Sequence, residues 1–380
     1  MGMGVEHKMS DKNPEMRETA ARICRDYLHG VWKHVTAQNI ILKRISGGLS
    51  NWLYNIQLPE GAVPIRGEPR QVLLRLYGQV HGERALEGLI TESVIFTLLS
   101  ERRLGPKLHG VFPGGRIEEY IPARPLLTKE LADSTLSSLI AEKMGHIHTM
   151  QIPISKEPKW IWETMNNWLN TATDILENNE DIDIQHLENI SAIKYINLEH
   201  EINWLKALVM QQKYPVTFCH NDMQEGNILL RQNTRKPELV LIDFEYCSYN
   251  YRGFDIANHF AEWQYDYTTP EYPFFHERPS AGPTKEQKLN FIRAYLKILG
   301  KEGSVEEQHV MMEVRVFSLT SHLFWGLWSI VNAKISQIPF GYWDYAASRL
   351  RNYMYLKEKI LASGPPALDG NLKRKSRDID

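Results

Sequence analysis

The loop 220–227, which contains Asp222 and Asn227, together with Asp243 downstream, constrains this chain more than any other part of the sequence. Short buried strands separated by polar residues are expected at 216–219, 228–231 and 239–242. This pattern places Asp222 in a loop that leaves the first strand and Asn227 at the start of the second. It places Asp243 at the end of the third strand, so three oxygen-bearing side chains stand at strand ends.

In protein kinases, an Asp and an Asn with this spacing, followed by a later Asp, carry out phosphoryl transfer. The first Asp accepts the proton of the substrate hydroxyl, the Asn binds one Mg²⁺ and the later Asp binds the bridging Mg²⁺. The reaction requires charge neutralisation and in-line positioning, and Mg²⁺ prefers oxygen ligands. The alternative is a polar hairpin in which Asp and Asn only cap the backbone. Three such residues in this order, between strands, favour the kinase interpretation.

Composition limits the possible classes of protein. The 380 residues correspond to one large or two medium domains, and the 43% hydrophobic content permits a sizeable core. Acidic and basic residues are mixed, with a formal net charge of −2, so we expect no nucleic-acid partner. The chain has no apolar stretch of membrane-spanning length and no apolar signal core at its start, so we expect no stable membrane insertion. Cys24, Cys219 and Cys247 lack metal-ligand spacing and fit reduced thiols of a cytoplasmic protein.

A glycine-bearing hairpin is expected early in the chain, with strands at 40–45 and 52–58. The turn between them consists of Ser46, Gly47, Gly48, Leu49, Ser50 and Asn51. Glycine lets backbone N–H groups approach phosphate oxygens, and Ser50 and Asn51 add side-chain donors. A Gly-Gly pair in a hairpin is more often only a turn. The position of this hairpin ahead of the kinase-like loop favours phosphate binding.

A single cation, Arg75, stands within the apolar strand expected at 71–77. Kinases place a cation on this strand, where it touches the nucleotide phosphates and pairs with a helix acid. Here that acid would be Glu92, in the helix expected at 91–103. An exposed arginine on an edge strand is the alternative.

A segment that leads out of the small sheet follows a further hairpin at 108–112 and 116–121. Its residues Glu119, Tyr120 and Ile121 stand where a kinase hinge holds adenine by backbone hydrogen bonds. We therefore divide the chain near residue 123. The expected parts are a disordered N-terminus (1–12), a nucleotide-binding lobe (13–122), a catalytic lobe (123–363) and a disordered tail (364–380).

Aromatic residues recur on the helices expected in the C-terminal part of the chain. Trp325 and Trp328 lie three residues apart and share a helix face, as do Tyr342 and Tyr345. Aromatic faces attract cations, and a box of them binds quaternary ammonium groups. Glu262 would supply a countercharge. The alternative is that these rings fill the helical core.

Taken together, these motifs resemble the choline/ethanolamine kinase family over about residues 20–360. The resemblance is carried by 47–51, 73–77, 104–108, 220–230, 242–246, 249–263, 325–328 and 340–345. It implies an α+β, bilobal protein-kinase-like fold, with a small N-terminal antiparallel β lobe and a larger, mostly helical C-terminal lobe. It also implies a homodimer that phosphorylates choline with ATP and Mg²⁺, the first step of the CDP-choline route to phosphatidylcholine. Position 119 of this chain is Glu, where relatives often have Gln.

The resemblance also assigns roles to residues. Asp222 would be the catalytic base, and Asn227 and Asp243 the Mg²⁺ ligands. The turn 46–51, Arg75, Gln224 and the hinge at 119–125 would bind ATP. The choline site would consist of Asp222, Tyr246, Glu262, Tyr267, Trp325, Trp328, Tyr342 and Tyr345. The many tryptophan and tyrosine rings at this expected site favour choline as the substrate, with ethanolamine as a weaker substrate. An ethanolamine-preferring kinase and a kinase-like binding protein without turnover remain the alternatives.

Overall fold

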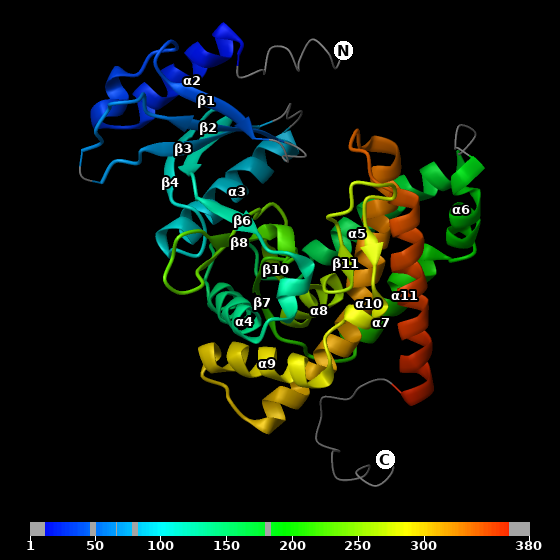
Figure 1. The fold of residues 1–380 in the computed structure, drawn as a ribbon. Helices are drawn as coiled ribbons and strands as arrows, with labels where there is room; N and C mark the ends of the chain where they lie inside the picture. Colours follow the sequence, from blue (N-terminus) through cyan, green and yellow to red (C-terminus); the bar gives the residue numbers. More distant parts are fainter. Residues whose placement is uncertain (1–11, 46–50, 66, 78–82, 179–183, 365–380) are drawn as a thin grey trace. The chain divides into compact units, whose positions relative to one another are not determined.

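The computed structural model describes residues 12–45, 51–65, 67–77, 83–178 and 184–364 (Figure 1). The chain divides into two compact units. One contains the residues up to 124 together with 231–244, and the other contains 125–230 together with the residues from 245 onward.

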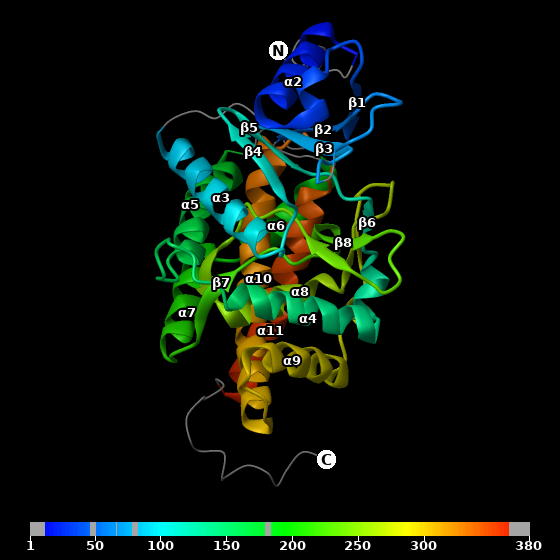
Figure 2. The same ribbon diagram turned by 90° about the vertical axis from the view of Figure 1, so that its left-hand side faces the viewer.

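The N-terminal unit is built on a five-stranded antiparallel sheet in the order β1-β2-β3-β5-β4. Its elements are α2 (Pro14–Tyr27), η1 (Gly30–His34), β1 (Ile41–Ile45), β2 (Asn51–Gln57), β3 (Gln71–Tyr77), α3 (Glu83–Glu101), β4 (Leu108–Phe112), β5 (Gly115–Glu119) and β9 (Leu239–Leu241). The sheet lies between α2 and α3 (Figure 2). Helix α3 corresponds to the helix expected at 91–103, but it begins earlier, at Glu83.

Alternation along the strands explains the core of this unit. Tyr54 and Ile56 on β2, and Val72 and Leu74 on β3, are buried at alternate positions and so point to one face. The apolar face of α2 covers them, with Ile23 among its buried residues. The apolar residues at every second position of the strands and those on one face of the helix are thus buried in the same core.

The segment 231–244 groups with the N-terminal unit, whereas our sequence-based division assigned it to the second lobe. Arg231 pairs with Glu119 at 3.0 Å, and the backbone N–H of Gln232 donates to the carbonyl of Pro122 at 2.9 Å. Farther along, the ring of Phe244 packs against Phe96 of α3. These contacts involve residues more than one hundred positions apart, so the local sequence pattern does not indicate them.

The second unit is mostly helical. Its elements are η2 (Thr128–Ala132), α4 (Ser134–His148), α5 (Trp160–Glu177), η3 (Ile184–His186), α6 (Leu187–Lys194), α7 (Leu198–Met210), β7 (Val216–Cys219), η4 (Glu225–Asn227), β10 (Ser248–Tyr251), α8 (Arg252–Glu262), β11 (Tyr265–Asp266), β12 (His276–Glu277), η5 (Pro279–Ala281), α9 (Lys285–Leu299), α10 (Ser304–Ile335) and α11 (Tyr342–Ser363). Strands β6 (Ala123–Pro125) and β8 (Ile228–Arg231) lie where the chain passes from one unit to the other.

Helix α10 is the central element of the second unit. It is 32 residues long and is buried along most of its second half, because it packs against α5, α8 and α11. Helix α11 lies beside it in both views (Figures 1 and 2). Gly326 permits this approach, because a Cβ there would meet Leu350 at 3.0 Å. Among the residues that the structure describes, no helix has both the length and the apolar character required to cross a membrane.

Candidate active site

The loop between β7 and β8 places Asp222 and Asn227 together. The side-chain nitrogen of Asn227 donates to the Asp222 carboxylate at 2.7 Å and to the Asp222 carbonyl at 3.0 Å. Since an amide carries its nitrogen and oxygen on opposite sides, the Asn227 oxygen is directed away from Asp222. The pair therefore presents a carboxylate and a carbonyl oxygen from one short loop.

Asn221, directly before Asp222, adopts a left-handed conformation with φ of 68°. Such a backbone costs on the order of 1–3 kcal/mol and persists only where neighbours enforce it. Its N–H donates to Asp255 at 2.9 Å and its side chain donates to the Tyr246 carbonyl at 2.8 Å. The side chain of Asn250 donates to its amide oxygen at 2.8 Å. The surrounding contacts thus hold the loop in the conformation that orients Asp222.

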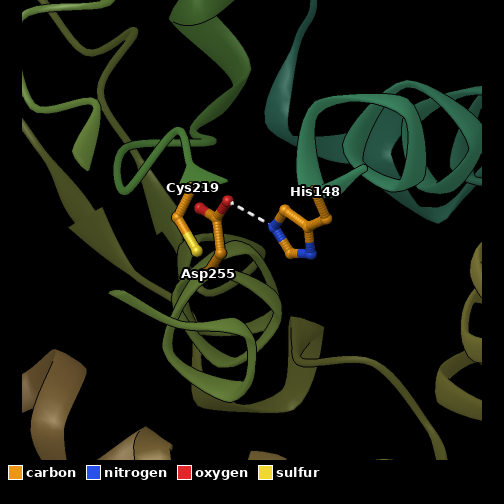
Figure 3. A group of neighbouring side chains, drawn as sticks. All are labelled: His148, Cys219 and Asp255. Carbon is orange, nitrogen blue, oxygen red and sulfur yellow. Dashed lines mark hydrogen bonds and ion pairs between the residues drawn. The ribbon is translucent and has the colours of Figure 1, made fainter. Parts of the chain in front are cut away.

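Asp255 is the buried anchor of this loop (Figure 3). One carboxylate oxygen accepts from the backbone N–H of His220 at 2.9 Å and lies 3.0 Å from Nε2 of His148. Burial alone would raise the pKa of Asp255, but hydrogen bonding and charge from His148, followed by His220, outweigh it and hold the pKa below its ordinary value. Asp255 therefore stays ionised beneath the loop that carries Asp222.

The side chains of His148, Cys219 and Asp255 come from α4, β7 and α8 and gather within 4.8 Å (Figure 3). Both oxygens of Asp255 are already hydrogen-bonded. Burial raises the pKa of the Cys219 thiol well above its ordinary value, which disfavours the thiolate that a metal would need. The arrangement suits structural support of the loop rather than metal binding.

A second buried histidine supports the middle of the loop. His259 donates through Nδ1 to the carbonyl of Met223 at 2.8 Å, and its Nε2 accepts from the indole N–H of Trp263 at 3.3 Å. Burial lowers the pKa of His259 to about 4, so the ring is neutral. The sequence pattern did not single out His259 or Asp255, although both lie on the helix directly after the kinase-like motif.

Asp243 lies in the N-terminal unit, two residues after β9 ends, with φ of 64°. Phe244 beside it is buried, with its ring centroid 5.9 Å from that of Phe96. Gly105 leaves room for this ring, because a Cβ there would meet Phe244 at 2.7 Å. Packing of Phe244 thus holds Asp243 in an unusual backbone conformation.

The expected ATP-binding residues are spread over several parts of the structure. Ser46, Gly47, Gly48, Leu49 and Ser50 lie outside the described residues, and Asn51 is the first residue of β2. Tyr120 and Ile121 follow β5 directly, as a hinge would, and the Glu119 side chain at the end of β5 pairs with Arg231. Gln224 accepts from the N–H of Gly226 at 2.8 Å.

Arg75 reaches an acid of the sheet. Its side chain pairs with Glu118 at 2.8 Å, and Glu118 also pairs with Arg116 at 2.7 Å. Arg116 in turn pairs with Glu92 of α3 at 2.7 Å. Glu92, the acid that we expected to pair with Arg75, thus pairs with Arg116 instead. Arg75 and Arg116 lie directly opposite each other on β3 and β5, and both pair with Glu118.

Four of the expected choline-site residues form one chain of ring contacts. The centroid distances are 5.6 Å from Tyr246 to Trp325, 5.5 Å from Trp325 to Trp328 and 5.8 Å from Trp328 to Tyr342. The indole N–H of Trp328 donates to the Tyr246 hydroxyl at 3.1 Å. Trp325 is buried and donates to Asn258 at 2.7 Å, whereas Trp328 is only partly buried.

Three further expected residues, Glu262, Tyr267 and Tyr345, form a second set, and Asp222 lies in the loop described above. Tyr267 donates to Glu262 at 2.8 Å and lies 2.7 Å from the hydroxyl of Tyr345. Phe340 joins the two sets, with centroids 5.1 Å from Tyr342 and 5.5 Å from Tyr345. We call these eight residues the aromatic group: Tyr246, Glu262, Tyr267, Trp325, Trp328, Phe340, Tyr342 and Tyr345.

Arg349 corrects one expectation about this group. It is fully buried, forms an ion pair with Glu262 and donates to the Tyr345 hydroxyl at 2.5 Å. Burial alone would lower the pKa of Arg349, but the charge of Glu262 outweighs it and raises that pKa well above its ordinary value. The pair carries no net charge, so Glu262 does not by itself make the group negative. A helical spacing of four residues from Tyr345 was the available signal for Arg349.

Comparison with known proteins agrees with this geometry. The family model "Choline/ethanolamine kinase" matches residues 42–354. A choline/ethanolamine kinase of Homo sapiens is 45% identical over 361 residues, covering 93% of this chain and 89% of that protein. Choline kinase alpha of Mus musculus is 43% identical over 382 residues, covering 93% and 83%.

Solved structures extend the comparison. The crystal structure of choline kinase from Cryptosporidium parvum Iowa II has a TM-score of 0.75 at 28% identity, and the match covers 91% of this chain and 97% of that one. A putative aminoglycoside phosphotransferase from Ralstonia eutropha shares the fold, with a TM-score of 0.57 at 13% identity over 90% and 98%. The predicted α+β, protein-kinase-like fold is confirmed. With the family model matching most of its length, the chain belongs to the choline/ethanolamine kinase family.

Proposed function

We propose that this protein transfers the γ-phosphoryl group of ATP to the hydroxyl of choline, and more weakly to that of ethanolamine. The observation that carries the proposal is the hydrogen bond from Asn227 to the Asp222 carboxylate, on a loop anchored by Asp255. The relatives named choline/ethanolamine kinase and choline kinase support it. Because Asp222 and the aromatic group belong to the same unit, one unit supplies both the base and the cation-binding surface.

Asp222 is the base in this proposal. Its carboxylate orients the choline hydroxyl and accepts its proton as the oxygen attacks phosphorus. Asn227 holds the carboxylate through its amide N–H, which restricts rotation of the carboxylate about its χ2 axis. The left-handed Asn221, fixed by three hydrogen bonds, sets the direction in which the loop leaves β7.

Two side chains fit Mg²⁺ by their chemistry. The side-chain nitrogen of Asn227 donates a hydrogen bond to Asp222, so the amide oxygen of Asn227 is the atom left to bind Mg²⁺. Asp243 contributes a carboxylate. When bound, Mg²⁺ would neutralise negative charge on the ATP phosphates. For ATP itself we propose the turn 46–51, Arg75, Gln224 and the hinge at Glu119, Tyr120 and Ile121.

The aromatic group is proposed to bind the ammonium head of the substrate. A quaternary ammonium has no N–H to donate, so ring faces and a diffuse negative field suit it. A primary ammonium requires discrete acceptors, which is the reason to expect ethanolamine as the weaker substrate. We further propose a homodimer, cytoplasmic localisation and no stable binding to nucleic acid or membrane.

A substrate panel tests the function. Purified protein with MgATP is given choline, ethanolamine, an aminoglycoside or a serine peptide, and transfer of labelled phosphate is measured. We expect the highest kcat/KM with choline and a lower value with ethanolamine. Preference for ethanolamine, or transfer to the aminoglycoside or peptide, would contradict the proposal. A single-turnover experiment with labelled ATP distinguishes an enzyme from a binding protein, because the latter transfers no phosphate to any acceptor.

A further inference from the structure

Two arginines lie directly opposite each other on neighbouring strands of the N-terminal sheet. Arg75 of β3 and Arg116 of β5 form a cross-strand pair, so their side chains leave the same face of the sheet. Like charges in this position repel each other. Because Arg116 is almost fully buried, little water is present to screen the repulsion. An acid on the same face is therefore needed to hold both side chains there.

Glu118 is that acid. It follows Arg116 by two residues on β5 and so shares its face. One carboxylate oxygen, Oε1, accepts from Nε of Arg75 at 2.8 Å and from Nε of Arg116 at 2.7 Å. Burial alone would raise the pKa of Glu118, but the charges of Arg75 and then Arg116 outweigh it and hold the pKa below its ordinary value. An ionised carboxylate thus bridges the two guanidinium groups.

Arg116 is also fixed from the side of α3. It pairs with Glu92 at 2.7 Å, donates to the Tyr77 hydroxyl at 3.1 Å, and its guanidinium lies 4.2 Å from the centroid of the Phe96 ring. In protein kinases, the acid of this helix binds the cation of the β3 strand directly. Here the acid of α3 binds Arg116, and the acid that binds Arg75 belongs to the neighbouring strand of the sheet.

We propose that Glu118 is the positioning residue of the phosphate-binding Arg75, in place of a helix acid. The inference rests on the proposed function, which assigns Arg75 to the ATP phosphates. An ion pair through Nε fixes the direction of the guanidinium, so Arg75 loses less conformational freedom when ATP binds. Since β3 and β5 belong to one sheet, this contact does not depend on the position of α3.

Glu118 affects ATP binding in two ways that have opposite signs. Its negative charge repels the phosphates, so a glutamine in its place would tighten binding if charge alone mattered. Its ion pair orients Arg75, so a glutamine would weaken binding if positioning mattered more. Positioning should be the larger effect, because the carboxylate contacts Arg75 at 2.8 Å but is separated from the phosphates by that arginine. The sign of the change therefore distinguishes the two.

Nucleotide binding without choline measures this sign. The Kd for MgATP and the Kd for adenosine, which has no phosphate, are determined by isothermal titration calorimetry for the wild type and for Glu118→Gln. We expect the variant to bind MgATP about tenfold more weakly and adenosine equally well. Tighter or unchanged binding of MgATP, or an equal loss for adenosine, would overturn the inference.

A further set of variants tests whether Glu118 acts through Arg75. Arg75→Gln should weaken MgATP binding, and adding Glu118→Gln to it should cause no further loss. A further loss of about tenfold in the double variant would show that Glu118 acts by another route. Glu92→Gln should bind MgATP as the wild type does. If it is instead as weak as Glu118→Gln, the helix acid shares the positioning of Arg75 and the inference is wrong.

The loss of a buried ion pair is controlled separately. Glu313→Gln breaks the buried pair with Arg252, which is 2.7 Å long and lies in the other unit. It should lower the melting temperature and leave the Kd for MgATP unchanged. A change in that Kd equal to the one in Glu118→Gln would show a general effect of stability and would refute the positioning role.

A charge-balanced comparison replaces the single variant if Glu118→Gln does not fold. Arg116→Met keeps the pair between Arg75 and Glu118. Adding Glu118→Gln then removes one positive and one negative charge in total, and no opposed arginines remain. The double variant should bind MgATP about tenfold more weakly than Arg116→Met. Equal or tighter binding would overturn the inference.

The outcome is separable from that of the proposed function. If Glu118→Gln weakens MgATP binding as expected but the wild type phosphorylates neither choline nor ethanolamine, the proposed function fails and Glu118 keeps its role. If the wild type phosphorylates choline but Glu118→Gln binds MgATP as the wild type does, the proposed function stands and the role of Glu118 is refuted.

Discussion

The side-chain nitrogen of Asn227 lies 2.7 Å from Oδ2 of Asp222 and donates a hydrogen bond to it. This contact joins two residues that lie five positions apart in the sequence, and it suits them to different tasks. The carboxylate is held in place by an amide donor, while the amide oxygen faces the opposite way. The proposed base and a proposed metal ligand thus share one loop without competing for the same atom.

Replacing Asp222 tests the base. Asp222→Ala should lower the transfer rate by about 10²–10⁴, because it removes the carboxylate that is proposed to accept the hydroxyl proton. Asp222→Asn keeps the shape of the side chain but cannot accept the proton, and should lose a comparable factor. Both kcat and the melting temperature are measured. Wild-type turnover in a folded Asp222→Ala protein would show that Asp222 is not the base.

Replacing Asp243 tests the proposed metal ligands. Asp243→Asn removes a negative charge from the proposed Mg²⁺ site and should raise the KM for MgATP or lower kcat, while choline binding changes little. The KM for MgATP at fixed free Mg²⁺ and the Kd for choline are compared with those of the wild type. A fall in choline affinity with unchanged use of MgATP would contradict the metal role.

Replacing Trp328 tests the aromatic group. Trp328→Leu keeps an apolar side chain but removes the ring face, and a desolvated cation–π contact contributes about 2 kcal/mol, or roughly thirtyfold in affinity. The KM for choline should rise, the KM for ATP should stay nearly constant and the preference for choline over ethanolamine should narrow. Phe317→Leu is the matched control, because Phe317 is fully buried on the same helix and its ring contacts no member of the aromatic group in the described part of the chain.

The control separates binding from packing. Phe317→Leu should lower the melting temperature and leave substrate preference as in the wild type, because its ring packs against Tyr214 and Tyr251. If Trp328→Leu behaves in the same way, the tryptophan belongs to the core and the cation-binding role is refuted.

Replacing Arg349 tests the buried ion pair. Arg349→Met leaves the buried Glu262 side chain without its ion-pair partner, which typically costs about 3–5 kcal/mol of unfolding free energy. Adding Glu262→Gln removes the unpaired charge and should recover part of the loss. The unfolding free energies of the two single variants and the double variant are compared. Additive losses would show that the two side chains do not interact.

The neutral His259 predicts a pH dependence of stability. Its pKa is about 4 in the folded protein and 6.5 ordinarily. Below pH 6.5 the unfolded chain binds a proton that the folded protein excludes. The contribution of His259 to the free energy of unfolding is therefore fully present above pH 6.5. It falls by about 3 kcal/mol as the pH decreases to 4. Urea unfolding at several pH values measures it. His259→Gln should flatten the curve in this window, and an unchanged slope would contradict the assignment.

Local patterns in the sequence determined several features of this protein. The apolar runs at 216–219 and 228–231 correspond to β7 and β8, and the expected helix that carries Trp325 and Trp328 corresponds to α10. The order of Asp222, Asn227 and Asp243 indicated phosphoryl transfer, because the chemistry requires those oxygen-bearing side chains at those spacings. Strand periodicity, helix periodicity and loop spacing are all short-range properties, and a single sequence contains them directly.

The tertiary structure alone decided which distant groups meet. Arg349 pairs with Glu262 across 87 positions of sequence, and Asp255 anchors Asn221 across 34. Likewise, the buried carboxyl of Glu225 accepts a hydrogen bond from the hydroxyl of Thr128, 97 positions away. No local periodicity specifies such partners, because they are set by the packing of whole helices and by the need to satisfy buried polar groups. The net charge at the proposed ammonium site follows from those pairings, so it could not be obtained from the identity of its residues.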